Sequence, residues 1–169
     1  RNRKREVACK FTSWRLSFPK GWGAPESVTL DAPRSWTEIP EFTAEAKAYS
    51  GTVVYETEFD FEGTIDSARC ILDFGKVETI AKVFLNGREV RTLWCEPYSC
   101  DVTGFVKKGR NILKVEVTNT WRNRVVYDLN QPEKNRKTWI LYRKNFNPPL
   151  DSPLIPAGIL GPVRVLFRF

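Results

Sequence analysis

The sequence predicts an all-β fold of the antiparallel β-sandwich or jelly-roll type, and three features support this class. Short runs in which apolar and polar residues alternate recur along the chain, which is the period of half-buried strands. Asn86-Gly87 lies between two such runs and suits a two-residue type I′ hairpin turn, in which both residues take positive φ. Eleven Pro and ten Gly separate the runs, and no convincing amphipathic helix interrupts them. Together these features favour two sheets packed face to face.

The 169 residues are enough for one hydrophobic core, so we expect a single β-sandwich domain over residues 1–169 with a basic lead-in at 1–6. A long, mostly irregular connection over 19–50 is expected to be functional or to pack as a cover. Trp14 and Trp139 lie inside strand-like runs and are expected in the core. The strand-like runs occupy residues 7–18, 27–30, 50–61, 67–75, 81–94 (the hairpin), 95–105, 112–119, 138–143 and 161–169.

The net charge of +7 is local rather than general. Residues 1–10 carry +4 and residues 121–144 carry +5, which leaves −2 for the remainder. The two basic segments could follow a phosphate backbone, although a solvated surface run is the commoner reason for such a pattern. Nucleic acid is therefore a less favoured partner. No apolar window approaches the roughly 18 residues of a membrane span, and the first eleven residues lack the apolar core of a signal peptide.

The residue types argue against independent catalysis. The chain has no His, which removes Ser-His-Asp and Cys-His machinery and all His-ligated metal sites. Glycoside hydrolysis needs two carboxyl groups about 5–9.5 Å apart, but the acids in the strands alternate with apolar residues and should face outward separately. These acids are Glu56, Glu58, Asp73 and Glu116. No catalytic residue, cofactor or metal ligand set is therefore expected.

Three alternatives remain open at this stage. Loop carbonyls with Asp101 or Asp128 could hold a structural Ca²⁺. A Cys95–Cys100 disulfide could close a short loop in an oxidising compartment. Cys70 alternates with apolar residues and is expected as a buried thiol.

Aromatic side chains beside polar ones are the best candidates for carbohydrate contact, because sugars present flat C–H faces that stack on Trp and Tyr rings. Two loops, 94–98 and 121–128, combine both kinds of side chain. For each Trp the alternative is packing against the sandwich or a partner domain, and an Arg–carboxylate pair with an Asn could instead fasten the second loop. The candidate carbohydrate-binding residues are Trp94, Glu96, Tyr98, Trp121, Asn123, Arg124 and Asp128.

Six segments in a fixed order resemble one family. They are WRLSFPKGWGAP, YSGTVVYETEFDF, LDFGKVETIAKVFLNGREV, LWCEPYSCDVTGFVKKGRNILKVEVTNTW, NTWRNRVVYD and PAGILGPVRV. Over residues 14–166 the chain resembles the galactose-binding-like jelly-roll domain of glycoside hydrolases. It is similar to the sugar-binding domain of family 2 β-galactosidases and β-glucuronidases and to the terminal domain of family 106 α-L-rhamnosidases. Two positions depart from the family pattern, with Tyr127 where Gly is usual and Ala157 where Ser is usual.

The resemblance implies a non-catalytic accessory module, because the catalytic centre of such hydrolases normally lies in a separate domain. The expected partners are the catalytic domain of the same polypeptide and a plant or host glycan, with no membrane. The expected location is the bacterial periplasm or exterior, in polysaccharide degradation, with the signal peptide absent from this fragment. The alternatives are a free-standing lectin-like sugar binder and a polyanion or nucleic-acid binder that uses residues 1–10 and 121–144.

Overall fold

Two ten-residue strands form the centre of the computed structural model, which describes residues 4–7, 9–62, 69–140 and 151–168. β4 (Thr52–Phe61) and β10 (Gly109–Thr118) pair antiparallel over their full length. Every second residue of each strand is apolar or otherwise buried, so one face of the pair enters the core and the other faces outward. This alternation confirms the strand prediction for both segments.

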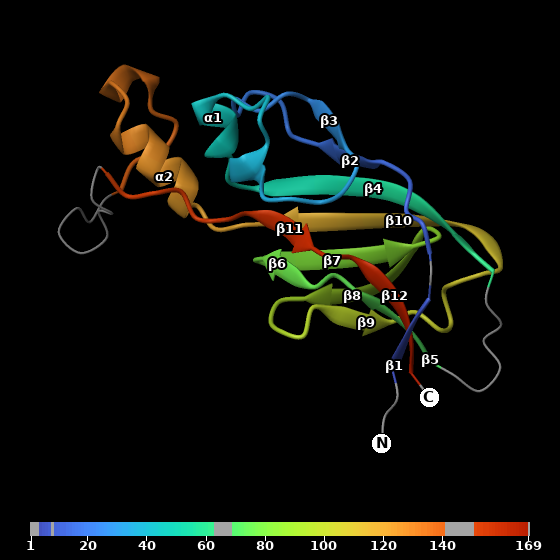
Figure 1. Ribbon diagram of the computed structural model, residues 1–169. Coiled ribbons are helices and arrows are strands. Elements are labelled where there is room, and N and C mark those ends of the chain that lie inside the picture. Colours follow the sequence, from blue (N-terminus) through green and yellow to red (C-terminus); the bar gives the residue numbers. More distant parts are fainter. Residues whose placement is uncertain (1–3, 8, 63–68, 141–150, 169) are drawn as a thin grey trace.

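The other strands extend this pair into a sandwich (Figure 1). One sheet has six strands in the order β3-β2-β4-β10-β7-β8, the facing sheet has four in the order β1-β12-β5-β9, and β11 pairs with β6 beside them. The named strand pairs of the described residues are all antiparallel. The predicted all-β sandwich is therefore confirmed. The remaining strands are β1 (Lys4–Val7), β2 (Trp14–Ser17), β3 (Ser27–Leu30), β5 (Arg69–Asp73), β6 (Lys76–Glu78), β7 (Ile80–Leu85), β8 (Arg88–Leu93), β9 (Ser99–Asp101), β11 (Gly158–Gly161) and β12 (Arg164–Arg168).

The predicted hairpin joins β7 to β8. Asn86 and Gly87 have φ of 52° and 78°, so both turn residues adopt the positive values that this turn requires. The Asn86 side chain also donates to the Phe105 carbonyl and to Asn111 Oδ1, at 2.9 Å each. The turn is thereby fastened to the neighbouring connection.

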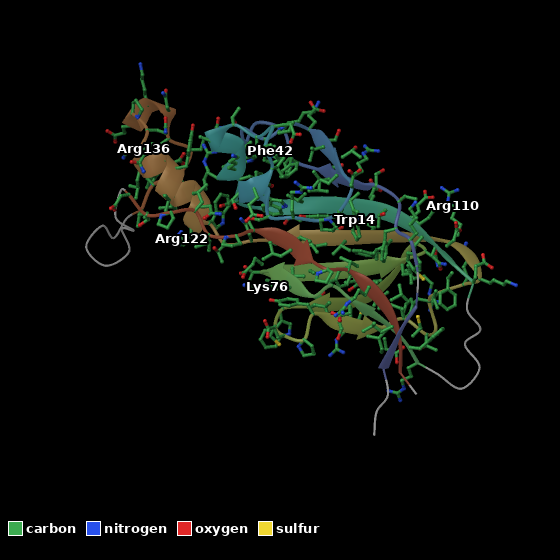
Figure 2. The ribbon with its side chains drawn as sticks, viewed as in Figure 1. Trp14, Phe42, Lys76, Arg110, Arg122 and Arg136 are labelled. Carbon is green, nitrogen blue, oxygen red and sulfur yellow. The ribbon has the colours of Figure 1, made fainter. Side chains whose placement is uncertain are left out.

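The segment over 19–50 packs over one part of the six-stranded sheet. This is the second of the two roles expected for it, that of a cover. It contains the 3₁₀ helix η1 (Trp36–Glu38) and the short helix α1 (Ala44–Lys47). The Phe18 ring packs against the rings of Trp36, Phe42 and Tyr49, at centroid distances of 5.9, 5.5 and 5.2 Å. These contacts extend the core, and Figure 2 shows side chains filling the space between the two sheets.

The structure corrects four expectations. The single strand expected over 7–18 is two strands in different sheets, because the chain crosses between the sheets around Phe11, which bridges Phe59. Residues 138–140 are not a strand, and the rest of the strand expected over 138–143 lies outside the described residues. Trp14 is buried as expected, but the Trp139 side chain is 82% exposed.

The fourth correction concerns residues 121–128, which were expected to be a loop. They contain most of helix α2 (Arg122–Leu129), and the 3₁₀ helix η2 (Glu133–Asn135) follows. The helix was missed because its buried face is largely polar, so no apolar stripe marks it in the sequence. Both helices α1 and α2 lie at one end of the sandwich (Figure 1). No helix of the described part of the chain is long and apolar enough to cross a membrane.

Candidate functional site

The first candidate loop, 94–98, connects β8 to β9 and is held at both ends. Leu93 and Tyr98 are 5% and 7% exposed, so each anchors one end in the core. The Tyr98 hydroxyl donates to the Thr79 carbonyl at 2.8 Å, and the Tyr98 carbonyl accepts from Phe74 N–H at 2.9 Å. Tyr98 therefore supports the loop from inside rather than presenting a ring on its surface.

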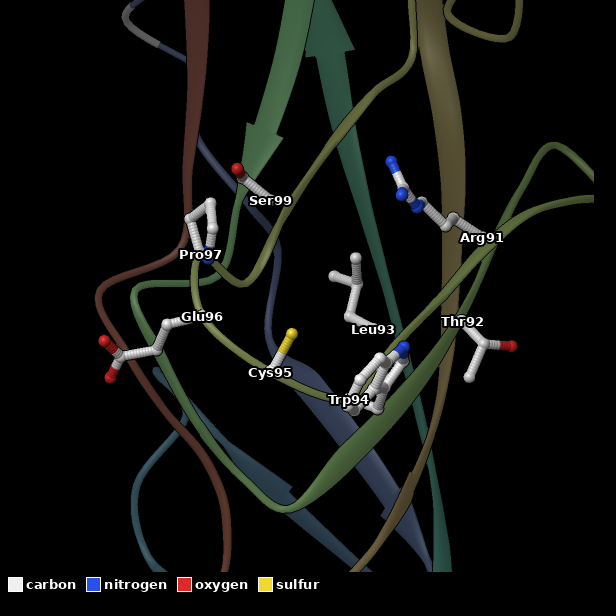
Figure 3. A pocket seen from close by; sticks show the side chains of 8 residues that line it. All are labelled: Arg91, Thr92, Leu93, Trp94, Cys95, Glu96, Pro97 and Ser99. Carbon is white, nitrogen blue, oxygen red and sulfur yellow. The ribbon is translucent and has the colours of Figure 1, made fainter.

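Between these anchors the loop exposes Trp94, Cys95, Glu96 and Pro97. Trp94 is 70% exposed, which is unusual for the largest apolar side chain. The loop and the end of β8 surround a hollow of about 160 Å³, which we call the β8–β9 hollow (Figure 3). Its lining residues are Arg91, Thr92, Leu93, Trp94, Cys95, Glu96, Pro97 and Ser99.

Arg91 is a lining residue that the sequence patterns did not single out. It pairs with Val83 in the hairpin, and directly opposite residues share one face of a sheet. Val83 lies in the core, so Arg91 extends from the core-facing side of β8 at the open edge of the sandwich. Its guanidinium makes no hydrogen bond or ion pair with any residue that the structure describes. The Glu96 carboxylate points away from it (Figure 3).

The second candidate segment, around α2, directs most of its polar groups inward. Asn123 is 1% exposed, and its amide donates to the Ile155 carbonyl at 2.8 Å and accepts from Ile155 N–H at 2.9 Å. This pair of bonds fastens the connection that precedes β11 to the helix. The contacts of Asn123 fit the structural role that the sequence left open for it, which is to hold this part of the chain against the sandwich.

Arg124 lies at the centre of a buried ion cluster. Its side chain is fully buried, and its Nη2 atom lies 3.0 Å from both Glu45 Oε1 and Asp128 Oδ1. Arg124 N–H also donates to the Ser50 hydroxyl at 3.1 Å. The hydrogen bond from Lys137 is the main cause that holds the pKa of Glu45 below its ordinary value; burial opposes this effect, and Arg124 adds a smaller lowering. The cluster thereby ties α1 to α2.

Asp128 uses its other oxygen to hold the chain beyond η2. Its Oδ2 atom accepts from Lys137 N–H, Thr138 N–H and Thr138 Oγ1 at 3.0, 2.7 and 2.7 Å. Burial raises the pKa of this carboxyl, but the hydrogen bonds from Thr138 and Arg124 outweigh it, and the net pKa is lowered. Asp128 is therefore an ionised internal clamp.

Trp121 is the residue of this segment that faces outward. It is 51% exposed, and its ring lies 5.6 Å from that of Trp22. The Arg124 guanidinium lies beneath, 5.7 Å from the Trp22 ring and 5.3 Å from the Tyr127 ring. Tyr127 thus adds a cation–π contact to the buried cluster.

Two of the strand carboxyl groups that were expected to face outward separately share one hollow. Glu56 and Glu58 line a second hollow of about 280 Å³ on the outer face of β4. Glu58 accepts from Arg110 Nε at 2.6 Å and also contacts Arg110 Nη2, and these bonds lower its pKa. Every carboxyl group with a shifted pKa among the described residues has it lowered, whereas a general acid requires a raised value. These groups are Glu45, Glu58, Asp101 and Asp128.

Comparison with known proteins places this geometry in a family. The profile of the family described as "Glycosyl hydrolase 2 galactose-binding domain-like" matches residues 41–148. The chain belongs to this family. The matched region contains β4, β7, β8 and β10.

Longer enzymes contain similar domains. A Formosa agariphila protein named "Putative beta-glucuronidase" is 32% identical over 177 residues, which cover 90% of this chain and 15% of that protein. The solved rhamnosidase from Novosphingobium sp. PP1Y is 33% identical with a TM-score of 0.84, over 99% of this chain and 15% of that one. A β-glucuronidase from an uncultured Clostridium sp. shares the fold, with a TM-score of 0.64 and 21% identity over 98% of this chain and 29% of its own. The galactose-binding-like domain thus spans about 15% of the length of the curated relative it matches.

The structure bears on both the Ca²⁺ alternative and the Cys95–Cys100 disulfide. Within the described residues of this galactose-binding-like domain, no three His, Cys, Asp or Glu side chains gather closely enough to hold a metal ion. Asp101 instead accepts from Thr103 N–H and Oγ1 at 3.0 and 2.6 Å. Cys95 and Cys100 are free thiols, the first exposed and the second buried, so the bridge between them is absent in this structure. The carbohydrate contacts assigned from the sequence stay a prediction.

Proposed function

We propose that this chain is a non-catalytic module of a larger bacterial glycoside hydrolase, in which it supports the catalytic domain and contacts carbohydrate. The observation that carries the proposal is the arrangement of its carboxyl groups. Hydrolysis of a glycosidic bond requires a pair that flanks the bond, one member being a general acid of raised pKa. The described carboxylates are either exposed or engaged with arginine, lysine, threonine or backbone donors, and none with a shifted pKa has it raised.

The lengths of the relatives support the same reading. A rhamnosidase and a protein named for β-glucuronidase activity each contain this domain as about 15% of a longer chain. The remaining length of such a protein has room for a separate catalytic domain. We therefore place the parent among rhamnosidase-like or family 2-like hydrolases of the periplasm or cell exterior, acting on a plant or host polysaccharide.

A lectin-like role without a catalytic partner is the second candidate, and the exposed indoles favour it. Trp94 and Trp121 present 70% and 51% of their surface to solvent, and exposed aromatic rings are the usual platform for a sugar face. Binding to nucleic acid has less support. Arg124 is buried, Arg136 donates to two main-chain carbonyls and Lys137 is bonded to Glu45, so these three cations of the basic segment have internal partners.

The test is hydrolysis by the purified 169-residue chain of 4-nitrophenyl α-L-rhamnoside, β-D-glucuronide and β-D-galactoside. We expect no turnover above buffer, and the full-length parent enzyme provides the positive control. Turnover that disappears in Glu56→Gln or Glu58→Gln would overturn the non-catalytic assignment. Removal of the module from the parent should lower the thermal stability of the remaining protein, and an unchanged melting temperature would contradict the supporting role.

A further inference from the structure

We propose that the β8–β9 hollow binds a carboxylated sugar unit, such as a hexuronic acid residue, with Arg91 holding the carboxylate and Trp94 covering the ring. This inference rests on the carbohydrate contact proposed above and adds the class of sugar that binds. It is carried by an arginine that makes no hydrogen bond or ion pair among the described residues and by an exposed indole, both on the lining of one small hollow.

The position of Arg91 is unusual for a charged residue. Leu93, two residues along β8, and Val83, its partner on β7, share its side of the sheet and are 5% and 0% exposed. A side chain at this register normally belongs to the core, and a cation there is normally paired. Arg91 reaches solvent only because β8 is the last strand of its sheet. In Figure 3 its guanidinium and the Ser99 hydroxyl lie on opposite sides of the view, with Leu93 between them.

The exposed indole is held in a rigid setting. Trp94 follows directly on the buried Leu93, and the loop ends at Tyr98, whose hydroxyl is bonded to Thr79. The main chain that carries the indole is anchored in this way, so little of its freedom is lost when a ligand covers the ring, which favours binding. Trp94 and Arg91 are three residues apart on extended chain, so their Cα atoms are about 10 Å apart. Both side chains line the same hollow, so a sugar unit bound in it can contact both.

The size and polarity of the hollow select the ligand class. Its volume of about 160 Å³ is roughly half that of the smallest pockets that enclose drug-sized molecules, which suits one sugar unit. A planar guanidinium matches a planar carboxylate through two parallel hydrogen bonds. A neutral sugar would leave the charge of Arg91 without a partner. The combination therefore favours a sugar acid over a neutral hexose.

A different role for Arg91 is conceivable on the same geometry. Charged side chains that point inward on an edge strand prevent the edges of two molecules from pairing, so Arg91 could protect β8 against aggregation. This role predicts that Arg91→Gln promotes association of the chain and that no sugar acid binds. The two roles therefore differ in a direct measurement.

The experiment is titration of the ¹⁵N-labelled chain with glucuronic acid and, as the matched neutral sugar, with glucose. The indole N–H signals and the arginine Nε–H signals are followed by NMR, and Trp94→Ala assigns its own indole signal. For a ligand of this size we expect a Kd of about 1 mM for glucuronic acid, with Trp94 and Arg91 among the shifted signals. Arg91→Gln should weaken binding about ten- to a hundredfold, since it removes charge-assisted hydrogen bonds. Arg88→Gln, on the same strand but outside the hollow, should not.

Four results would overturn the proposal. The first is that neither signal shifts at 50 mM glucuronic acid, and the second is that glucose binds equally well. The third is that sodium acetate alone, or glucose 6-sulfate, binds as tightly as glucuronic acid. The fourth is an Arg91→Gln chain that elutes as an aggregate while the unmodified chain binds no sugar acid. Failure here leaves the module assignment intact, because that assignment is tested by hydrolysis and by the stability of the parent enzyme.

Discussion

Substitution of Asp128 by Asn tests whether the buried ion cluster stabilises the α2 end of the sandwich. The change keeps the size of the side chain but removes its charge. Oδ2 accepts three hydrogen bonds within 3.0 Å, and Oδ1 lies 3.0 Å from the buried Arg124 guanidinium. Each charge-assisted bond that becomes neutral loses about 1 kcal/mol, so the free energy of unfolding should fall by about 3 kcal/mol. For a domain of this size the melting temperature should fall by about 6–12 °C.

The pH dependence separates the effect of charge from that of shape. The pKa of Asp128 is lowered in the folded chain, so its contribution is complete above the unfolded-state value near about 4 and is lost as the pH falls through the folded value. Urea unfolding, followed by tryptophan fluorescence at pH 7 and pH 3, should show a smaller difference between the two chains at pH 3. Asp31→Asn, at an exposed position, is the matched control and should cost less than about 0.5 kcal/mol. A loss for Asp128→Asn equal to the control, or one that does not shrink in acid, would refute the reasoning.

Three further predictions concern the same scaffold. Asn123→Ala leaves the N–H and carbonyl of Ile155 without their side-chain partner and should cost about 2–3 kcal/mol in urea unfolding, whereas Asn135→Ala, at an exposed position, should cost under about 0.5. Gly158→Ala should lower the free energy of unfolding by more than about 2 kcal/mol, because φ is +95° and the added Cβ would lie 2.5 Å from Trp36 Nε1 and Tyr55 Oη. Gly87→Ala is the control. Its φ is also positive but the space around it is open, so it should lower the free energy of unfolding by about 1 kcal/mol. Ellman's reagent should modify the exposed Cys95 first, while Cys70 and Cys100, whose pKa burial raises to about 12, should react only on unfolding; equal rates for all three would contradict their placement.

The long central strands and the β7–β8 hairpin could be predicted because their signal is local. The alternation around Tyr55 and Val115 and the Asn86-Gly87 turn each depend on a few neighbouring residues, and the structure has the strands and turn where the pattern indicates. Helix α2 could not be predicted in this way. Its inward residues Arg124 and Asp128 are buried only because Glu45, 79 residues before Arg124, and Thr138 supply their partners. No periodicity in the sequence contains that information.

The candidate site was found in part for the same reason. Trp94 was identifiable because it follows a strand and precedes Glu-Pro, a loop signal. Arg91 was missed because alternation alone does not reveal that β8 is the edge strand, where an inward position opens to solvent. The strand order determines the environment of Arg91: the same register would lie in the core of a central strand but lies at the rim of this edge strand. Edge strands of a predicted sandwich therefore need to be searched for charged residues at inward registers.

The two candidate segments use similar residues in opposite ways, and this contrast indicates where a ligand should bind. At the α2 end, Asn123, Arg124 and Asp128 spend their hydrogen bonds on the chain itself, and only Trp121 keeps a largely exposed ring. At the β8–β9 end, the anchors Leu93 and Tyr98 are internal, whereas the side chains of Arg91 and Trp94 make no hydrogen bond or ion pair with any residue that the structure describes. Polar groups that stabilise a fold cannot be given up to a ligand without loss of stability. A ligand therefore gains most at the β8–β9 hollow, whose arginine makes no hydrogen bond or ion pair in the described part of the chain.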